Sequence, residues 1–459
     1  MSTQRAVVIG GSIAGLCAAR VLADWFDRVT VVDRDAYPAG ALERAGVPQG
    51  RHVHALLAGG RRELERLFAG FDRSMLAAGA HEIDFSWDFA ALRTGGWAPR
   101  EASGITTLFA SRALLETTVR DLLRAVPRVE LVERTAVTGI VADGDGRPRA
   151  RGVRTADGEL PADLVVDASG RTSRTPEWLR TLGLEPPAET IVDSFAGYST
   201  RWFRAPDPSR WPRGWWWKAI WIDPRVPDHM TAGVLFPAEQ GRWIVTVAGL
   251  GRHYPPSDEE GFTAALAGLR SPLLAEAVRL AEPVSPVYCN RAMANRFRHY
   301  ERWGERLEGF VAVGDSVCAF NPVYGQGMTT AAMTANILAD CIDRVGPTSP
   351  ALPREFFRAQ GRFLRDPWGL ATGADFVVPG TEGPRPPLIG VFNRYMEALF
   401  AASADDAGLR RRLWEVFHML RRPSALFELP VIAQVLLSAF RGLARPVSVG
   451  GVDSPPASA

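Results

Sequence analysis

Glycines and acids at the ends of apolar runs are the residues of this chain best suited to bind a nucleotide. The run AVVIGG (6–11) leads into SIAGLCAARVLADWF (12–26) and then VTVVDRD (29–35). This order predicts a strand, a glycine-rich turn, a helix and a second strand ending in acid, which is the dinucleotide-binding unit. Gly10 permits the tight turn, and Gly15 lets the helix lie close to the sheet. The free N–H groups at the start of the helix would face a pyrophosphate.

One position departs from the usual G-x-G-x-x-G spacing, because Ser12 stands where the second glycine is expected. A small side chain still lets the backbone approach the phosphates, so the prediction of a dinucleotide site holds. Asp33 ends the second strand and is placed to accept hydrogen bonds from the hydroxyls of an adenosine ribose. The predicted cofactor contacts in this unit are Gly10, Ser12, Ile13, Ala14, Gly15, Asp33 and Arg34.

Two later stretches repeat the arrangement of a buried strand that ends in acid. ADLVVDASGRTSRTPEWL (162–179) reaches Asp167, and FVAVGDSVCAFNPVYGQGM (310–328) reaches Asp315. Three such strands suit a long ligand such as FAD better than NAD, with the adenosine at the first and the ribityl chain at the third. A helix starting near Gly327 would direct its positive end at the N1–C2=O edge of the flavin. The further predicted cofactor contacts are Asp167, Gly170, Gly314, Asp315, Gly325, Gln326, Gly327 and Met328.

Length and composition exclude several classes of protein. A chain of 459 residues is too long for one core, and a net charge of +2 indicates no nucleic-acid partner. The four cysteines form no C-x-x-C pair, which predicts neither a disulfide framework nor a metal site and fits the cytoplasm. The N-terminal apolar run is a strand rather than a signal peptide. LPVIAQVLLSAF (429–440) is too short to span a membrane, so we expect a packed C-terminal helix and no stable membrane insertion.

The three motifs GGSIAG (10–15), VVDASG (165–170) and GDSVCAFNPVYGQGM (314–328) resemble those of one enzyme family. That family is the single-component FAD-dependent monooxygenases of the aromatic-hydroxylase and squalene-epoxidase superfamily. Within it, the chain is most similar to the bacterial polyene epoxidases of polyether biosynthesis, of the monensin and lasalocid type. The similarity rests on VPQGRHVH (47–54), FASRALLETTVR (109–120), PVYGQGM (322–328) and RDPW (365–368), and it covers roughly the first 370 residues.

The resemblance implies an α/β fold of the p-hydroxybenzoate hydroxylase type. A Rossmann-like, GR2-type FAD domain would be built from residues 1–185 and 286–345, with a substrate-binding β-sheet domain over 186–285. Residues 346–445 would form a helical C-terminal region and 446–459 a disordered tail. The residues agree independently, because aromatic and β-branched stretches separated by Pro, Asp and Gly turns in 195–250 predict an antiparallel sheet.

The resemblance also gives roles to residues between the motifs. Arg51 would lie near the flavin or the pyrophosphate, and Arg112 along the pyrophosphate and ribityl chain. His52 and His54 alternate along the chain, so only one of them need face the flavin. The predicted flavin-proximal residues are Pro322, Tyr324, Arg51 and His54. Pro322 and Tyr324 would act by shape, the histidine would either shuttle a proton or be packed or hydrogen-bonded, and no side chain is assigned to acid–base catalysis.

The tract GWWWKAIWI (214–222) is the most aromatic segment of the chain. Alternation would place Trp215 and Trp217 on one face with Ala219, where they would line an apolar substrate cavity or form the sheet core. Phe236 is a third candidate substrate contact. The tract is similar to the G-W-x-W-x-I-P motif of flavin halogenases. Its proline is missing, and the only lysine, Lys218, lies within it, which disfavours halogenation.

These features predict an FAD-dependent monooxygenase that epoxidises or hydroxylates a lipophilic secondary metabolite, such as a polyketide or terpenoid alkene or an aromatic ring. The resemblance implies antibiotic biosynthesis, oxygen transfer from O2 through a flavin C4a-hydroperoxide, and NAD(P)H as electron donor. The chain has no second glycine-rich nucleotide motif, so NAD(P)H would bind transiently or act through a separate flavin reductase. The alternatives are a flavin-dependent reductase of prenyl double bonds, a flavin halogenase, and a flavoprotein that only binds a pathway intermediate.

Overall fold

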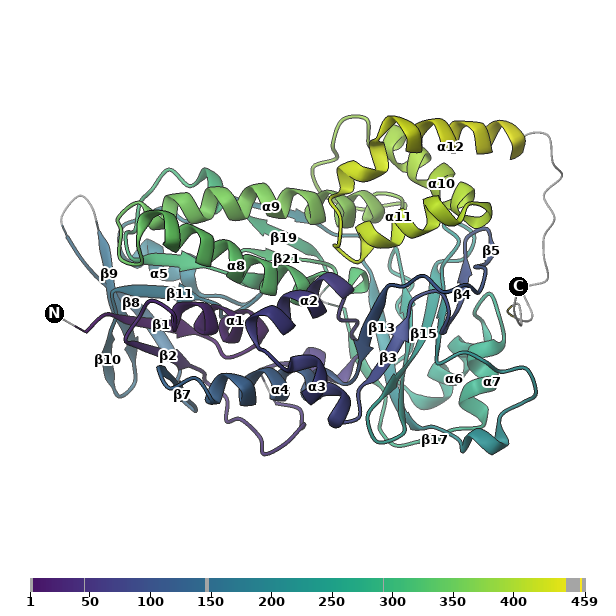
Figure 1. Ribbon diagram of the computed structural model, residues 1–459, viewed down its shortest axis with the longest axis horizontal. Coiled ribbons are helices and arrows are strands. Elements are labelled where there is room, and N and C mark those ends of the chain that lie inside the picture. Colours follow the sequence, from purple (N-terminus) through teal and green to yellow (C-terminus); the bar gives the residue numbers. More distant parts are fainter. Residues whose placement is uncertain (1–2, 45, 145–147, 292, 443–454, 456–459) are drawn as a thin grey trace.

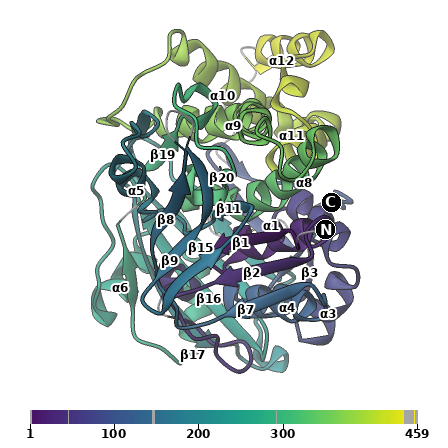
Figure 2. The same ribbon diagram turned by 90° about the vertical axis from the view of Figure 1, so that its left-hand side faces the viewer.

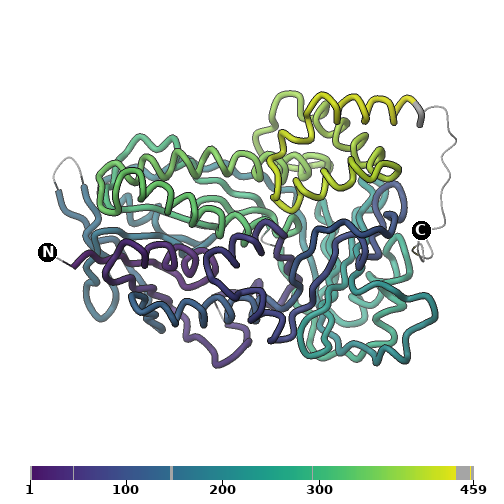
Figure 3. Tube along the Cα trace, viewed as in Figure 1, coloured from purple at the N-terminus to yellow at the C-terminus, as the bar shows by residue number. Residues whose placement is uncertain are grey.

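The computed structural model describes residues 3–44, 46–144, 148–291, 293–442 and residue 455. Two sheets lie at opposite ends of an elongated molecule, and the C-terminal helices cover one side of the second sheet (Figures 1 and 3). The predicted disordered tail, 446–459, lies outside the described residues except for residue 455.

A parallel sheet forms the end of the molecule that holds the N-terminus. Its strands are buried Val, Ile, Leu and Ala runs, as expected where both faces of a sheet are covered. The strand order is β20 (Phe310–Ala312), β11 (Leu164–Asp167), β1 (Arg5–Ile9), β2 (Arg28–Val32) and β7 (Val129–Val132). The three motif strands therefore lie next to one another, with β11 between β1 and β20, although the chain separates them by up to three hundred residues.

Helices cover this sheet in layers. The helix α1 (Ile13–Leu22) packs against α8 (Gly327–Val345), and α8 packs against α9 (Leu352–Asp375), as Figure 1 shows. On the other side, a meander of β8 (Val137–Asp143), β9 (Arg149–Thr155) and β10 (Gly158–Pro161) lies against the sheet (Figure 2). The helices α2 (Ala58–Leu67) and α4 (Arg112–Arg124) contact α1 and lead toward the second sheet.

The second sheet is larger, and all but one of its central pairings are antiparallel. Its order is β17 (Glu282–Pro283), β13 (Gly197–Arg204), β16 (Arg242–Gly249), β15 (Thr231–Ala238), β14 (Ala219–Ile222), β4 (Phe89–Arg93) and β5 (Gly96–Trp97), with β18 (Tyr288–Asn290) also paired to β13. Most of its strands come from the expected stretch 186–285. Two strands, β4 and β5, come from within 1–185, and β4 pairs with β14 in parallel.

Each face of the large sheet carries a separate apolar cluster. One face packs against α6 (Glu259–Ala267) and α7 (Leu273–Arg279), which contribute Phe262 and Leu274. The opposite face carries an aromatic cluster. We define it by Ala58, Ile83, Phe85, Phe89, Ala91, Ile105, Phe109, Ala219, Phe236 and Trp414, with Val53, Ala55, Ala98, Trp221, Val234, Phe417 and Leu420 packed against it.

The tryptophan tract does not alternate as expected. The strand begins only at Ala219, and Trp215 and Trp217 pack in the α6–α7 cluster whereas Ala219 lies in the aromatic cluster. The reason is local: the N–H groups of Lys218 and Ala219 both donate to the carbonyl of Asp88. Successive N–H groups of a regular strand point in opposite directions, so the pleat is interrupted at this point.

The C-terminal region is helical, with α10 (Ile389–Asp405), α11 (Ala407–Phe417) and α12 (Leu429–Gly442) beyond α9 (Figure 1). The expectation of a fully packed final helix is wrong. Val431 and Val435 of α12 are buried, but the exposed fractions of Leu429 and Phe440 are 82% and 81%. Across the described ranges, no helix is both long and apolar enough to cross a membrane.

The remaining helices and strands are short. They are α3 (Phe71–Ala77), α5 (Thr175–Thr181), the pair β3 (His81–Asp84) and β6 (Thr106–Phe109), and the small sheet of β12 (Glu189–Val192), β19 (Asn295–Arg298) and β21 (Cys318–Ala319).

We predict that Gly59→Ala destabilises the contact between α2 and the end of α11. A methyl group at this position would lie 2.7 Å from the carbonyl oxygen of His418 and 2.8 Å from that of Met419, both backbone atoms that cannot move aside alone. The expected loss in the free energy of unfolding is about 2 kcal/mol, measured by urea denaturation. The matched control is Gly369→Ala in α9, where no heavy atom lies within 4 Å. An equal effect of both substitutions would contradict the close contact.

Candidate functional site

The first motif forms a turn that only glycine can make. Gly10 has a φ of +102°, and a Cβ there would lie 2.6 Å from the carbonyl oxygen of Ala168 at the end of β11. A Cβ on Gly15 would lie 1.8 Å from the carbonyl oxygen of Gly10, so α1 can approach the turn only without a side chain. The first and second motifs are thus in contact through their backbones.

The N-terminus of α1 is open to an anion. Ser12 is its N-cap residue, but the side chain makes no capping hydrogen bond, and the first turn holds no acid. Instead, the Ser12 hydroxyl donates to Glu116 Oε2 at 2.8 Å and accepts from Arg112 Nη2 at 2.8 Å. The first-turn N–H groups and the positive end of the helix dipole therefore remain available to a phosphate.

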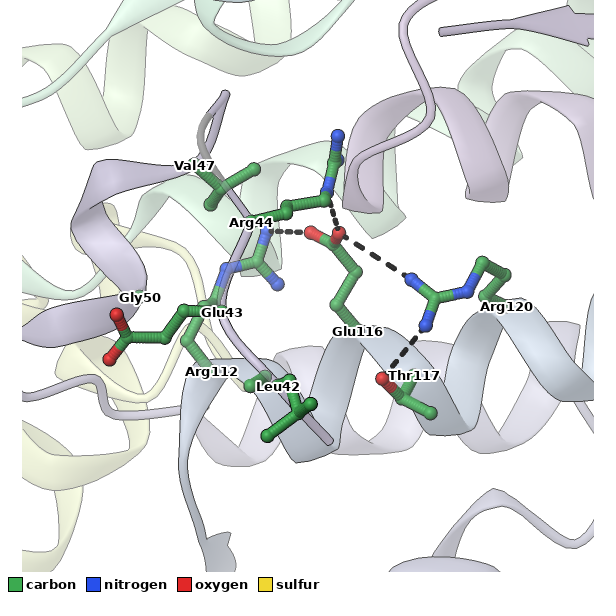
Figure 4. A pocket seen from close by; sticks show the side chains of 10 residues that line it. Leu42, Glu43, Arg44, Val47, Gly50, Arg112, Glu116, Thr117 and Arg120 are labelled. Atoms are coloured by element: carbon green, nitrogen blue, oxygen red, sulfur yellow. Dashed lines mark hydrogen bonds and ion pairs between the residues drawn. The ribbon is translucent and has the colours of Figure 1, made fainter. Parts of the chain in front are cut away.

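Glu116 of α4 is the centre of a buried charge cluster beside this turn (Figure 4). Its carboxylate contacts Arg44 Nε at 2.6 Å, Arg112 Nη2 at 3.1 Å and Arg120 Nη1 at 3.9 Å. Burial opposes ionisation of Glu116, but Arg112 and Arg44 outweigh it and hold its pKa below the ordinary range. The cluster joins α4 to the loop that carries Arg44.

Asp33 occupies the predicted position at the end of β2, and its carboxylate is already engaged. Oδ2 accepts from the N–H of Gly11 at 2.7 Å and from Arg44 Nη1 at 2.9 Å, and Oδ1 accepts from the N–H of Asp35 at 2.9 Å. A carboxylate offers about four acceptor positions, so one remains for a ribose hydroxyl. The neighbouring Arg34 is exposed.

Arg112 fits the role expected for it beside a diphosphate. Its side chain is buried, Nη2 is used by Ser12 and Glu116, and Nη1 has no partner in the described part of the chain. Burial lowers the pKa of its guanidinium, with Glu116 opposing that effect. A buried cation with an unused donor, next to an uncapped helix N-terminus, is suited to hold the diphosphate of FAD.

The first and third motifs meet at Gly314. Its φ is +65°, and a Cβ there would lie 2.6 Å from the Cβ of Ala14 in α1. Asp315 follows, and a Cβ on Gly327 at the start of α8 would lie 3.8 Å from its Oδ1. Burial raises the pKa of Asp315 against the opposing charges of Arg171 and Arg112. The predicted ribityl contact and the predicted flavin helix therefore lie side by side.

Asp167 has a different role from the one expected. Its carboxylate is fully buried and accepts from the N–H and hydroxyl of Ser169, and from the hydroxyls of Ser173 and Thr175. Four internal hydrogen bonds make it a structural residue of the loop that contains Gly170. The backbone of this loop, rather than the acid, lies against Gly10.

The loop before α8 is fixed by a residue that the motifs do not contain. Asp375, at the end of α9, accepts from Tyr324 Oη at 2.6 Å, from Asn295 Nδ2 at 2.5 Å and from Asn321 Nδ2 at 3.2 Å. The side chain of Tyr324 is therefore held by its hydrogen bond to Asp375, whereas Pro322 is exposed. The helix α8 begins without a side-chain cap or an acid in its first turn, and the Gln326 Oε1 atom is buried without a partner.

The segment from Arg51 to His54 divides between the two ends of the molecule. Arg51 is exposed and pairs with Glu43 at 3.1 Å, and its carbonyl accepts from Trp202 Nε1. His52 Nδ1 contacts Thr200 Oγ1 of the large sheet at 2.9 Å. His54 Nδ1 contacts the carbonyl of His52 at 3.0 Å, and burial and the charge of Arg112 lower the pKa of His54 to about 3; its place beside the flavin stays a prediction.

The three predicted substrate residues do not lie together. Phe236 belongs to the aromatic cluster, with its ring centroid 4.5 Å from that of Phe109, whereas Trp215 and Trp217 are on the opposite face of the sheet. The aromatic cluster adjoins the α8 loop, because a Cβ on Gly325 would lie 3.6 Å from the carbonyl oxygen of Ala55. A substrate role stays a prediction for all three residues.

Comparison with known proteins agrees with this architecture. The model of the FAD-binding domain family matches residues 3–345. Protein Rv3254 of Mycobacterium tuberculosis is 34% identical over 456 residues, which cover 94% of this chain and 93% of that protein. The flavin-dependent brominase Bmp2 has a TM-score of 0.67 at 16% identity, over 96% of this chain and 99% of that one. The p-nitrophenol 4-monooxygenase PnpA of Pseudomonas putida DLL-E4 has a TM-score of 0.61 at 18% identity, over 92% and 100%.

The fold is that of the p-hydroxybenzoate hydroxylase-like flavoproteins, which confirms the predicted fold class. The chain belongs to the FAD-binding domain family, whose model matches residues 3–345. FAD is thereby confirmed as the cofactor class. The polyether epoxidase subtype stays a prediction.

Several residues of the site were missed by sequence reasoning. Glu116 lies one helical turn after Arg112, a spacing that signals an ion pair on one helix face. Arg44 and Asp375 carry no comparable local signal, because their partners lie in other elements.

We predict that Arg112→Met weakens FAD binding at least about tenfold, because it removes a buried cation that has an unused donor. The measurement is the dissociation constant of FAD by quenching of flavin fluorescence, with circular dichroism to verify folding. The control is Arg124→Met, which changes an exposed arginine of the same helix that pairs with Asp121. Unchanged affinity in Arg112→Met would remove this residue from the cofactor site.

We also predict that the protein loses stability in mild acid. Burial lowers the pKa of His52 to about 4 and that of His418 to about 3, whereas an unfolded histidine titrates near 6.5. The unfolded chain therefore takes up protons below pH 6.5 that the folded protein does not, and each such histidine costs roughly 2 kcal/mol between pH 7 and 5.

Urea denaturation at both pH values measures this loss. His52→Gln is expected to reduce the loss by about 2 kcal/mol. The control His253→Gln changes an exposed histidine and should leave the pH dependence unaltered. A pH dependence that stays the same in His52→Gln would contradict the assignment.

Proposed function

We propose that the protein is an FAD-dependent monooxygenase that transfers one oxygen atom from O2 to a lipophilic alkene or aromatic ring. The observation that carries this proposal is the junction of two features. Ala55, which packs against the aromatic cluster, lies against Gly325 in the loop before α8, where the flavin ring is expected. An apolar surface at that position would hold a carbon-rich substrate beside the reacting face of the cofactor.

The atoms of this reaction balance with one external electron donor. NAD(P)H or a reductase supplies two electrons; one oxygen atom of O2 enters the substrate, and the other leaves as water. FAD, when bound, supplies the activation of O2. The protein must then bind and orient the substrate and exclude water, which are tasks for apolar side chains and not for an acid–base pair.

The charges around the site suit the binding of FAD by the protein. Arg112 and the N-termini of α1 and α8 offer positive potential to the diphosphate and to the edge of the flavin that gains negative charge on reduction. Tyr324 is held by Asp375, and burial and this acid raise its pKa well above the ordinary value. It therefore stays protonated and shapes the loop.

Halogenation, the function that the name of Bmp2 describes for that protein, has less support in this chain. Halogenation would require a lysine near the flavin. Lys218 is the only lysine, its side chain is half exposed, and its Nζ pairs with Asp88 Oδ1 at 3.1 Å.

The test is turnover of a panel of polyenes and aromatic polyketides with 18O2. The enzyme is reduced with NADPH, or with dithionite in a separate arm, so that the result does not depend on the natural donor. We expect a product heavier by one 18O atom, detected by mass spectrometry, and an absolute requirement for O2.

Other outcomes would contradict the proposal. A saturated double bond formed under argon indicates a prenyl reductase. A brominated product in the presence of bromide indicates a halogenase. Release of H2O2 without any product from the whole panel indicates a flavoprotein that only binds its ligand.

A further inference from the structure

The end of α11 brings two polar side chains onto the aromatic cluster. Trp414 and His418 lie four residues apart, which places them on one face of the helix and its cap. The ring centroid of Phe85 lies 5.1 Å from that of Trp414 and 4.3 Å from that of His418. The exposed fraction of His418 is 1%, and neither residue was expected from the sequence to contribute to a site.

The hydrogen bonds of His418 determine its tautomer. The backbone N–H of Ala58 donates to His418 Nδ1 at 3.1 Å, and a backbone N–H can only donate. Nδ1 must therefore carry a lone pair, so in the neutral ring the proton is on Nε2. Burial lowers the pKa of His418 to about 3, with Asp84 opposing that effect, and the ring is neutral near pH 7.

Among the residues that the structure describes, neither the Nε2–H of His418 nor the Nε1–H of Trp414 has an acceptor. Buried donors without partners are rare because each loses its hydrogen bonds to water without replacement. The rings of Phe85 and His418 are nearly perpendicular, and an aromatic ring is only a weak acceptor. Two such donors on one helix face, beside an apolar surface, indicate that an acceptor comes from a ligand.

This position is close to the expected flavin. The carbonyl of His418 accepts from the N–H of Gly59, and a methyl group on Gly59 would lie 3.0 Å from Met333 Cε of α8. Only the first residues of α2 therefore separate His418 from α8. The seven apolar residues that pack against the aromatic cluster, including Ala55 and Trp221, are partly accessible.

We propose that His418 is a specificity-determining residue, whose Nε2–H donates a hydrogen bond to a carbonyl or ether oxygen of a polyene or aromatic substrate. Trp414 Nε1–H is the second donor of the same subsite. The inference rests on the proposed function only in taking the aromatic cluster as the substrate surface. The subsite selects oxygenated substrates over pure hydrocarbons, because a hydrocarbon leaves both N–H donors without a hydrogen bond.

The test uses two probes of the same shape, 2-acetylnaphthalene and 2-isopropenylnaphthalene. The first has a carbonyl oxygen where the second has a methylene group. Their dissociation constants for the FAD-loaded protein are measured by isothermal titration calorimetry without reductant. We expect the ketone to bind about tenfold more tightly. Equal affinities, or no binding of either probe, would overturn the inference.

Two variants separate the donor role from a structural one. In His418→Gln the terminal amide reaches the position of Nε2, so a donor is kept and the acceptor for Ala58 is lost. In His418→Asn the side-chain oxygen can replace Nδ1 toward Ala58, but the amide is too short to replace Nε2. We expect the preference for the ketone to persist in His418→Gln and to fall to about one in His418→Asn. The reverse order would mean that His418 only holds α2.

The binding test and the turnover test fail independently. A tenfold preference for the ketone without 18O incorporation would overturn the proposed oxygenation and leave this subsite intact. Incorporation of 18O with equal binding of the two probes would overturn the subsite alone.

Discussion

The cofactor end of the molecule depends on the buried carboxylate of Glu116. An unpaired buried charge is too costly to persist, so Glu116 requires the cations around it, and those cations require an acid. Arg44 and Arg112 meet this need from different parts of the chain, and Ser12 joins them to the turn before α1. The Ser12 side chain makes these contacts and no capping hydrogen bond, so the first turn of α1 keeps free N–H groups for a phosphate.

Buried polar groups that need partners also join the C-terminal region to the first 345 residues. Asp375 accepts hydrogen bonds from Tyr324, Asn295 and Asn321, and so determines the shape of the loop before α8. His418 holds the start of α2, because its Nδ1 accepts from the N–H of Ala58 and its carbonyl accepts from the N–H of Gly59. The helices beyond residue 345 therefore help to form the site, although the family model ends there.

The large sheet separates two kinds of apolar surface. One face is covered by α6 and α7 and by four tryptophans, Trp211, Trp215, Trp217 and Trp243. The other meets the α8 loop and contains Phe85, Phe89, Phe109 and Phe236, with Trp414 from α11. The second face lies beside Gly325, so Trp215 and Trp217 are on the face away from the expected flavin, whereas Trp221 of the same segment is on the face toward it.

The sequence by itself determined the nucleotide-binding end, because strand, glycine turn and terminal acid are local patterns that depend on backbone geometry. It predicted Asp33 and Asp315 at the ends of their strands, three motifs that meet at one cofactor, and a helix that starts near Gly327. Only the tertiary structure decided which face Trp217 occupies, that Asp167 serves its own loop, and which partners Glu116, Asp375 and His418 contact. These facts depend on contacts between elements that are distant in the sequence. A buried charge or hydrogen-bond donor needs a partner, and the fold determines which residue is close enough to be that partner.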